Sequence, residues 1–211
     1  MTRILLFPAL IFTLSLAAAI GIIRARPYDA GDLRAFLLPP EGCAPPCFMG
    51  IRVGSMTTGQ VIEWLEQHPW VERVLLTENF AATRRGFVGW KWNGGQPGLL
   101  DGSISGALWI RDHVVRFVRV QTTIPFGSLW LLLDKPASGT FRVERDFIAA
   151  GPVIVHYAAF PGAAFTAQIT VSCPLRPAEF WQKPVLLQYY VELSEQFSDY
   201  DLRRWIHESV C

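Results

Sequence analysis

An uncharged run near the N-terminus limits what this chain can fold into more than any other feature. After Arg3, no charged side chain occurs from Ile4 to Ile23. As an α-helix rising about 1.5 Å per residue, this run would be about 30 Å long, the thickness of the hydrocarbon core of a bilayer. The alternative is a buried core helix, which so long an uncharged run at a chain terminus disfavours. The run therefore predicts a membrane-directed segment.

Two fates of this segment fit the sequence. It resembles a signal peptide in that the small residues Ala17–Ala19 offer a cleavage site. Cleavage there would leave the mature chain with an apolar start, so we expect residues 1–23 to remain as a signal anchor. The flanking charges do not fix the orientation, because Arg3 and Arg24 lie on opposite sides of the run. We therefore expect a membrane-anchored chain with an extracytoplasmic domain, or a secreted one if the segment is cleaved.

The cysteines also indicate an oxidising compartment. An even number of cysteines behind an export segment is typical of disulfides. Between the first two stand Pro45 and Pro46, which favour a tight bend. A redox-active pair usually has two residues between its cysteines, whereas this pair has three, and no second ligand pair for zinc stands nearby. We expect structural disulfides that use Cys43, Cys47, Cys173 and Cys211.

Composition excludes some classes of protein. The chain is 51% hydrophobic and 18% charged, which indicates a packed core and argues against disorder. The formal net charge is +1, and the basic residues are dispersed along the chain. Because nucleic-acid binders concentrate basic residues in a patch, we expect no nucleic-acid partner.

The first helix of the folded part is marked by its two ends. Thr57 or Thr58 is a suitable N-cap, and apolar residues follow at helical spacing. Pro69 stops the helix. Before it, residues 24–42 have the character of a stalk with a short helix over 32–38.

Strand-like segments follow, with apolar residues on alternate positions. In one of them Val88, Trp90 and Trp92 share a face. A closing helix over 198–209 begins with Ser198 as its cap. The expected strands are 73–80, 85–92, 104–110, 114–122, 139–147, 152–160, 165–173 and 184–193.

A helix-to-proline pattern occurs twice. Residues 51–69 align with residues 118–136 at a constant offset of 67, including the closing prolines Pro69 and Pro136. Chance similarity is the alternative, because amphipathic helices that end at proline are common. The predicted fold class is α+β, a tandem pair of small antiparallel-sheet-plus-helix units. The first unit spans 43–117, and the second spans 118–211 with its C-terminal helix.

The segment "IRVGSMTTGQVIEWLEQHP" resembles a pattern in the SmpA/OmlA lipoproteins and the tandem β-lactamase inhibitor protein family. In that pattern an apolar lead, a glycine and Met-Thr precede a short helix that closes at proline. "TIPFGSLWLLLDKP" is similar to a second copy. The resemblance implies an extracytoplasmic binding or scaffold module without chemistry. Unlike the lipoproteins, the chain has no cysteine directly after its apolar segment, and it is also similar to uncharacterised exported bacterial proteins.

Catalytic motifs are missing from the sequence. The four histidines stand apart, and His156 lies in an apolar strand, where a core role is expected. Asp112 and His113 are neighbours on the chain, and neighbours on a strand point to opposite faces. No nucleophile elbow or phosphate-binding loop occurs. We therefore expect no enzyme, no cofactor and no metal.

The tryptophans are the remaining candidates for function. A loop at 93–98 follows two of them, and an exposed loop flanked by large rings suits contact with a partner. Core packing is the alternative explanation. We expect an extracytoplasmic, membrane-tethered binding or scaffold module with an unknown protein partner. A small-ligand or sensor domain with an aromatic groove is the alternative, and a hydrolase or thiol-redox protein is the least favoured. The candidate binding surface is Trp90, Trp92, Asn93 and Trp109.

Overall fold

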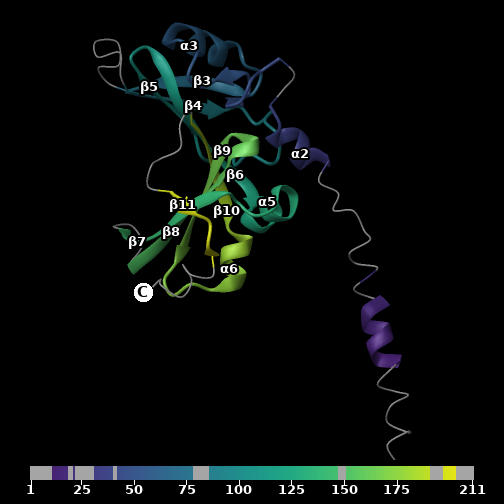
Figure 1. Cartoon of the computed structure of the whole chain (residues 1–211). Helices are drawn as coiled ribbons and strands as arrows, with labels where there is room; N and C mark the ends of the chain where they lie inside the picture. Colours follow the sequence, from purple (N-terminus) through teal and green to yellow (C-terminus); the bar gives the residue numbers. More distant parts are fainter. Residues whose placement is uncertain are drawn as a thin grey trace, which may run out of the picture. The chain divides into compact units, whose positions relative to one another are not determined.

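The computed structural model describes residues 11–18, 21, 31–39, 42–77, 86–146, 151–190 and 197–202. The chain divides into two compact units, Met1–Gly31 and Asp32–Cys211 (Figure 1). In the first unit, residues 11–18 are helical and exposed. Within the described ranges, no helix combines the length and the apolar character that crossing a bilayer requires. Most of the expected span over Ile4–Ile23 lies outside these ranges.

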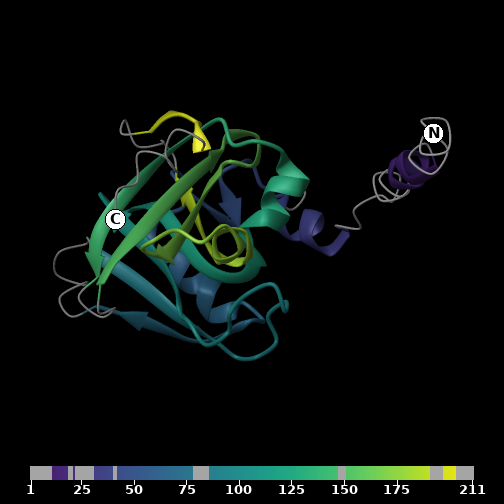
Figure 2. The same cartoon turned by 90° about the horizontal axis from the view of Figure 1, so that it is seen from below.

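The second unit is built on one large antiparallel sheet, which confirms the predicted α+β class (Figures 1 and 2). Its nine strands run in the order β11-β7-β8-β9-β10-β6-β5-β4-β3, and a separate hairpin forms a two-stranded sheet. The hairpin strands are β1 (Cys47–Phe48) and β2 (Ile51–Arg52). The strands of the large sheet are β3 (Val71–Leu76), β4 (Gly86–Trp92), β5 (Gly106–Arg111), β6 (Val114–Pro125), β7 (Ser138–Asp146), β8 (Gly151–Phe160), β9 (Phe165–Ser172), β10 (Pro184–Tyr190) and β11 (Ser198–Asp199).

Helix α3 begins and ends where local sequence signals place it. Thr57 caps α3 through a capping box, in which its side chain accepts from the Gln60 amide and the Gln60 side chain accepts from the Thr57 amide. The helix ends at Gln67, with His68 as its C-cap directly before Pro69, as predicted. After the helical residues 11–18, the described helices are α2 (Gly31–Leu37), α3 (Thr58–Gln67), α5 (Phe126–Leu133) and α6 (Pro177–Gln182), with a short 3₁₀ turn, η1 (Pro161–Ala163).

Two meanders of four strands make up most of the sheet. Helix α3 precedes β3-β4-β5-β6, and α5 precedes β7-β8-β9-β10 with α6 inserted before the last strand. The final strands of the two meanders pair with each other, with Val118 opposite Tyr189. Thr122 adds a side-chain link by donating its hydroxyl to the Val185 carbonyl at 2.8 Å. The expected boundary between residues 117 and 118 falls inside β6.

In the second unit, α3, α5 and α6 pack on one face of the sheet, and α2 reaches the same face through Phe36, whose ring contacts Phe48 beside Tyr189. The alternate residues Val88, Leu108 and Val118 are fully buried, and α3 buries Val61 and Leu65 over this part of the sheet. Farther along, rings from α5 and α6 contact the buried His156 of β8. The opposite face, which we call the helix-free face, has no described helix on it.

The disulfides agree with the sequence where they can be seen. Cys43 and Cys47 are bonded, with their Cα atoms 6.0 Å apart. Cys173 is also disulfide-bonded, and its expected partner, Cys211, lies outside the described residues.

The expected closing helix is wrong at its start. Ser198 and Asp199 form β11, which pairs with Gly139 and Ser138 of β7. The backbone remains extended because Tyr200 donates its amide to the Ala137 carbonyl at 3.4 Å and its side chain reaches His156. Residues 203–209 of the expected helix lie outside the described residues.

Glycine is required at position 106 by close packing. A Cβ built on Gly106 would overlap the ring of Trp90, which is fully buried and has no space to retreat. We expect Gly106→Ala to lower the free energy of unfolding by about 1–3 kcal/mol, the usual cost of overpacking a core. Urea denaturation measures this change.

The matched control is Gly59→Ala in α3, where a Cβ meets nothing within 4 Å. Alanine there should raise the free energy of unfolding by about 0.5 kcal/mol, because alanine favours the helix. Equal effects of the two substitutions would contradict the packing of Trp90 against β5.

Candidate functional site

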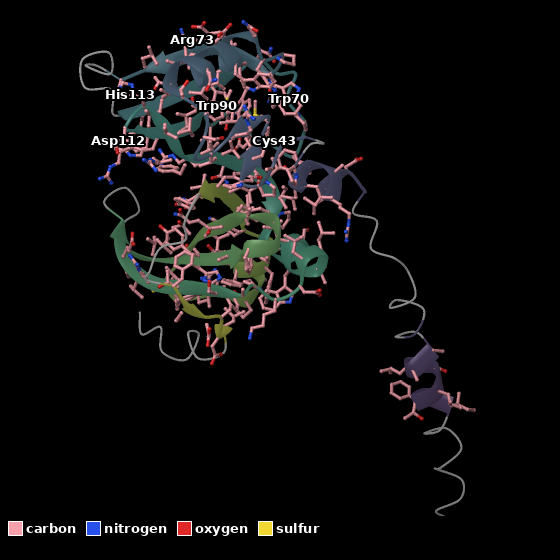
Figure 3. The ribbon with its side chains drawn as sticks, turned by 45° about the horizontal axis from the view of Figure 1, so that its top comes forward. Cys43, Trp70, Arg73, Trp90, Asp112 and His113 are labelled. Carbon is pink, nitrogen blue, oxygen red and sulfur yellow. A yellow bond between two sulfur atoms is a disulfide. The ribbon has the colours of Figure 1, made fainter. Side chains whose placement is uncertain are left out.

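The structure places two of the predicted site residues in the core. Trp90 and Trp92 are 0% and 7% exposed, with ring centroids 5.5 Å apart. The Trp92 indole donates to the Ile104 carbonyl at 2.8 Å. Figure 3 shows Trp90 inside the first meander. These two rings therefore offer no surface to a partner in this structure.

The other two predicted residues lie apart from each other. Asn93 is exposed in its loop, where its amide donates to the Pro69 carbonyl at 2.7 Å and its Oδ1 accepts from the Gly95 amide. Trp109 is half-buried and, by strand alternation, points to the helix-free face. The structure does not bring the four residues together, and a binding role stays a prediction for Asn93 and Trp109.

Trp109 belongs to a row of aromatic rings that crosses four strands. The strand register sets Phe87 opposite Trp109, Trp109 opposite Phe117, and Phe117 opposite Tyr190. Consecutive ring centroids are 4.6 Å apart for Phe87 and Trp109 and 5.5 Å apart for Phe117 and Tyr190. We call these four residues the aromatic row. Phe87 is 39% exposed, and the other three are half-buried, so the row is open to contact from the helix-free face.

Positively charged side chains lie beside the aromatic row at its Phe87 end. The Arg119 guanidinium carbon lies 5.6 Å from the centroid of the Phe87 ring, within range of a cation–π interaction. Arg73 and Lys91 stand directly opposite each other on neighbouring strands, and both are exposed. Like charges in this position repel, and neither forms a salt bridge with a described residue. This part of the helix-free face is therefore suited to an anionic surface.

A polar cluster continues the helix-free face beyond the row. Gln188 donates to Gln168 at 2.7 Å, and the Tyr190 hydroxyl donates to Gln188. Burial, reinforced by the nearby Tyr157, raises the pKa of Tyr190 to about 12. Tyr190 is therefore uncharged at neutral pH and acts there as a hydrogen-bonding group.

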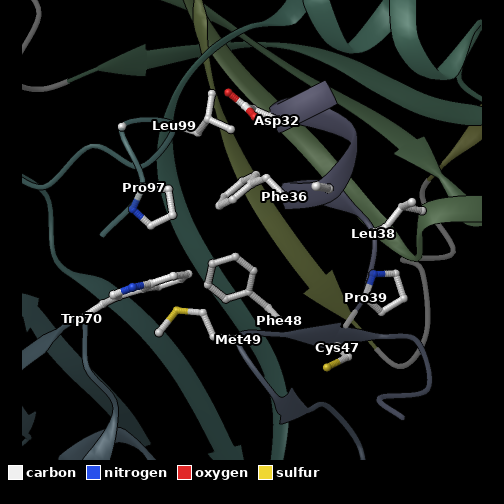
Figure 4. A pocket seen from close by; sticks show the side chains of 12 residues that line it. Asp32, Phe36, Leu38, Pro39, Cys47, Phe48, Met49, Trp70, Pro97 and Leu99 are labelled. Carbon is white, nitrogen blue, oxygen red and sulfur yellow. The ribbon is translucent and has the colours of Figure 1, made fainter. Parts of the chain in front are cut away.

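An apolar pocket lies elsewhere, between the N-terminal segment of this unit and the loop before β5 (Figure 4). Its volume is about 670 Å³, in the range of small-molecule sites. Its walls are formed by helix α2, hairpin β1–β2, Trp70 and a loop at 97–99. The lining residues are Asp32, Ala35, Phe36, Leu38, Pro39, Cys47, Phe48, Met49, Trp70, Pro97, Gly98 and Leu99.

Several contacts fix the hairpin that forms one wall of the pocket. The Phe48 ring lies 6.0 Å from the Phe36 ring of α2 and 5.2 Å from the Tyr189 ring of β10. Trp64 of α3 donates its indole N–H to the Met49 carbonyl at 2.8 Å. The disulfide at Cys47 ties the start of the hairpin to Cys43. The pocket wall is therefore attached to both meanders, through α3 in one and β10 in the other.

Two titratable residues, Asp112 and His113, stand in a surface turn. The Asp112 carboxylate lies 3.6 Å from Arg111 Nε and 3.7 Å from Arg116 Nη2. It shares with His113 the turn after β5, where both have positive φ (Figure 3). Among the described residues, no three His, Cys, Asp or Glu side chains are grouped so that they could hold a metal ion.

Among the described histidines, His156 has the most strongly shifted pKa. It is fully buried, with Nδ1 3.2 Å from the Thr140 carbonyl and Nε2 2.8 Å from the Tyr200 hydroxyl. These contacts suit a neutral ring whose Nδ1–H donates and whose Nε2 accepts. Burial lowers the pKa of His156 to about 4. The prediction of a core histidine with satisfied hydrogen bonds is confirmed.

No protein-family model, curated protein or solved structure matches the chain. Function is therefore inferred from the aromatic row, the cations beside it and the pocket. The sequence did not indicate a pocket, although Phe48 and Met49 directly follow Cys47 and Trp70 directly follows the helix-stopping Pro69. It found Trp109 but not the three rings that stand beside it, because cross-strand register is absent from a linear pattern.

His156 makes the stability of the fold depend on pH. Its pKa is about 4 when folded and about 6.5 when unfolded, so the unfolded chain binds the extra proton between these values. Its contribution is present above pH 6.5 and is lost as the pH falls through 4. From pH 7 to pH 4, the wild-type protein should lose about 3 kcal/mol more unfolding free energy than His156→Phe.

Urea unfolding at several pH values measures this difference. The variant keeps every other titrating group, including His68, whose pKa burial also lowers. Parallel pH profiles for the wild type and His156→Phe would show that His156 is not held neutral in the core.

Proposed function

We propose that this protein is an extracytoplasmic, membrane-tethered binding module of the cell envelope, without catalytic activity. In this proposal residues 1–23 are the anchor. The stalk expected over 24–42 is shortened by α2, which belongs to the folded unit and buries Leu33 and Leu37 there. Cleavage of the anchor would give a secreted form of the same module. The observation that carries the proposal is the aromatic row with cations beside it, of which Arg73 and Lys91 form no salt bridge with a described residue. The disulfides support an oxidising compartment.

The composition of the helix-free face supports a protein partner. Trp, Tyr, Phe and Arg are enriched at the centres of protein interfaces, where large rings exclude water. Here such rings stand in one row, and Arg119 lies over Phe87, the most exposed ring of the row. Arg73 and Lys91 add a cationic margin that a partner's carboxylates would neutralise. The partner that best suits this surface is apolar at its centre and acidic at its edge.

Internal duplication belongs to the same proposal. Moving α3 (Thr58–Gln67) by the offset of 67 gives residues 125–134, which contain α5 (Phe126–Leu133). The same shift carries β4 (Gly86–Trp92) to residues 153–159, inside β8. In the sheet, Val71 of β3 lies opposite Trp92 of β4. The shift carries these two residues onto Ser138 and Ala159, which lie opposite each other on β7 and β8.

This agreement supports two copies of a helix followed by four antiparallel strands. It also supports the proposed likeness to the SmpA/OmlA and β-lactamase-inhibitor-protein modules, which was based on the short segments at 51–69 and 118–136. A pair of such units side by side buries more apolar surface than either unit alone.

The pocket favours a second function, the binding of a small ligand. A cavity of about 670 Å³ with mostly apolar walls is large enough for a molecule with many heavy atoms. This agrees with the alternative of an aromatic ligand site, although none of the predicted tryptophans lines the cavity. The two functions use different faces of the sheet, so they do not exclude each other.

Cross-linking on intact cells tests the location and the partner together. A membrane-impermeant amine-reactive cross-linker should join the full chain to a partner, which quantitative mass spectrometry identifies. Phe87→Ser and the charge reversal Arg73→Glu/Lys91→Glu should each reduce the cross-linked partner about tenfold or more, because hot-spot rings and opposed charges carry binding energy.

Matched changes on the other side of the molecule serve as controls. Leu131→Ser replaces a side chain that is 67% exposed on α5, and Lys135→Glu/Arg176→Glu reverses two exposed charges. Both should leave the cross-link unchanged. The same set of cross-linked proteins for all variants would contradict the role of the helix-free face, and no labelling of intact cells would contradict the extracytoplasmic location.

A further inference from the structure

The pocket beside α2 has the chemistry of a site for a methylated ammonium ion. We propose that it binds an organic cation that carries a trimethylammonium group, such as choline or a choline headgroup. This inference rests on the proposed small-ligand function and adds the class of ligand.

Aromatic rings form one side of the cavity. Phe36, Phe48 and Trp70 lie next to one another along it (Figure 4), and the first two rings are 6.0 Å apart. The face of an aromatic ring is electron-rich and attracts a cation placed over it, most strongly for tryptophan. Rings from three separate elements therefore line the side against which a methylated cation would lie.

The charge of the cavity also favours a cation. Asp32 is the one charged side chain among the described lining residues, and it lies beside Leu99 at one end of the cavity (Figure 4). It forms no salt bridge with another described residue. The basic residue nearest along α2, Arg34, does not line the cavity. A cation would meet an opposite charge here, whereas an anion would be repelled.

The apolar walls select among cations. A primary ammonium or a guanidinium carries N–H groups that must find acceptors when they leave water. Met49, Pro97 and Leu99 offer few such acceptors on the remaining walls. A trimethylammonium group has no N–H to satisfy and presents methyl groups to these side chains. The volume of about 670 Å³ leaves room for the chain attached to the cation.

Isothermal titration calorimetry at constant ionic strength tests the proposal. The probes are choline and its uncharged isostere, in which a tert-butyl group replaces trimethylammonium. Because only choline gains from the rings and the carboxylate, it should bind about tenfold more tightly than the isostere. Trp70→Leu should weaken choline binding roughly tenfold, and Asp32→Asn, at an exposed carboxylate, roughly threefold.

Glu66→Gln is the control for Asp32→Asn, because it removes the same charge from an exposed position of α3 outside the pocket. It should leave choline affinity unchanged. Asp32 is exposed, so Asp32→Asn tests the site even if Trp70→Leu fails to fold. Equal affinity for choline and the isostere would overturn the cation inference and leave the small-ligand function standing. Binding of neither probe would overturn the inference, and a neutral apolar library would then test the small-ligand function by itself.

Vesicles distinguish the two sources of this group. Because the proposed anchor would bind either vesicle type, the readout is the excess of sedimentation with phosphatidylcholine over phosphatidylglycerol vesicles, and this excess should appear if the lipid headgroup is the natural ligand. Binding of free choline without such an excess would assign the pocket to a soluble choline compound. An excess that Asp32→Asn and Trp70→Leu do not reduce would place the headgroup contact outside the pocket and would count against the inference.

Discussion

The pairing of β6 with β10 is the interaction on which the rest of the structure depends. Each meander alone would end in an exposed edge strand, and such strands tend to pair with other chains. Here the two final strands pair with each other, and the Thr122 hydroxyl adds a buried hydrogen bond to the Val185 carbonyl. The sheet therefore continues through the middle of the unit, and its helices can share one face.

Both candidate sites follow from this pairing. On the helix-free face, the aromatic row passes from Phe117 of β6 to Tyr190 of β10, so it is complete only when these strands are neighbours. On the helix-bearing face, Tyr189 of β10 supports Phe48 in the pocket wall. Alternation along one strand thus sends neighbouring tyrosines to different sites. The fold positions a proposed protein interface and a proposed cation site on opposite sides of the same strand.

Local signals in the sequence predicted local structure well. The Thr57 cap and Pro69 marked both ends of α3, and alternation marked the buried side of β4. The features that the sequence did not predict depend on contacts between residues that are far apart in the chain. Ser198 has the character of a helix cap, but pairing with β7 and the contact between Tyr200 and His156 hold it as a strand. The pocket and the aromatic row depend on which strands become neighbours, and a sequence pattern read along the chain contains no such information.

Hydrogen exchange of the backbone amides tests the junction most directly. The continuous-sheet account predicts that the amides of β6 and β10 that bond to each other belong to the slowest-exchanging set and exchange only through global unfolding. They should then share one opening free energy, equal to the free energy of unfolding in urea. Rapid exchange along β10 while β6 stays protected would show that the two meanders open separately, and the account of both sites would fail with the junction.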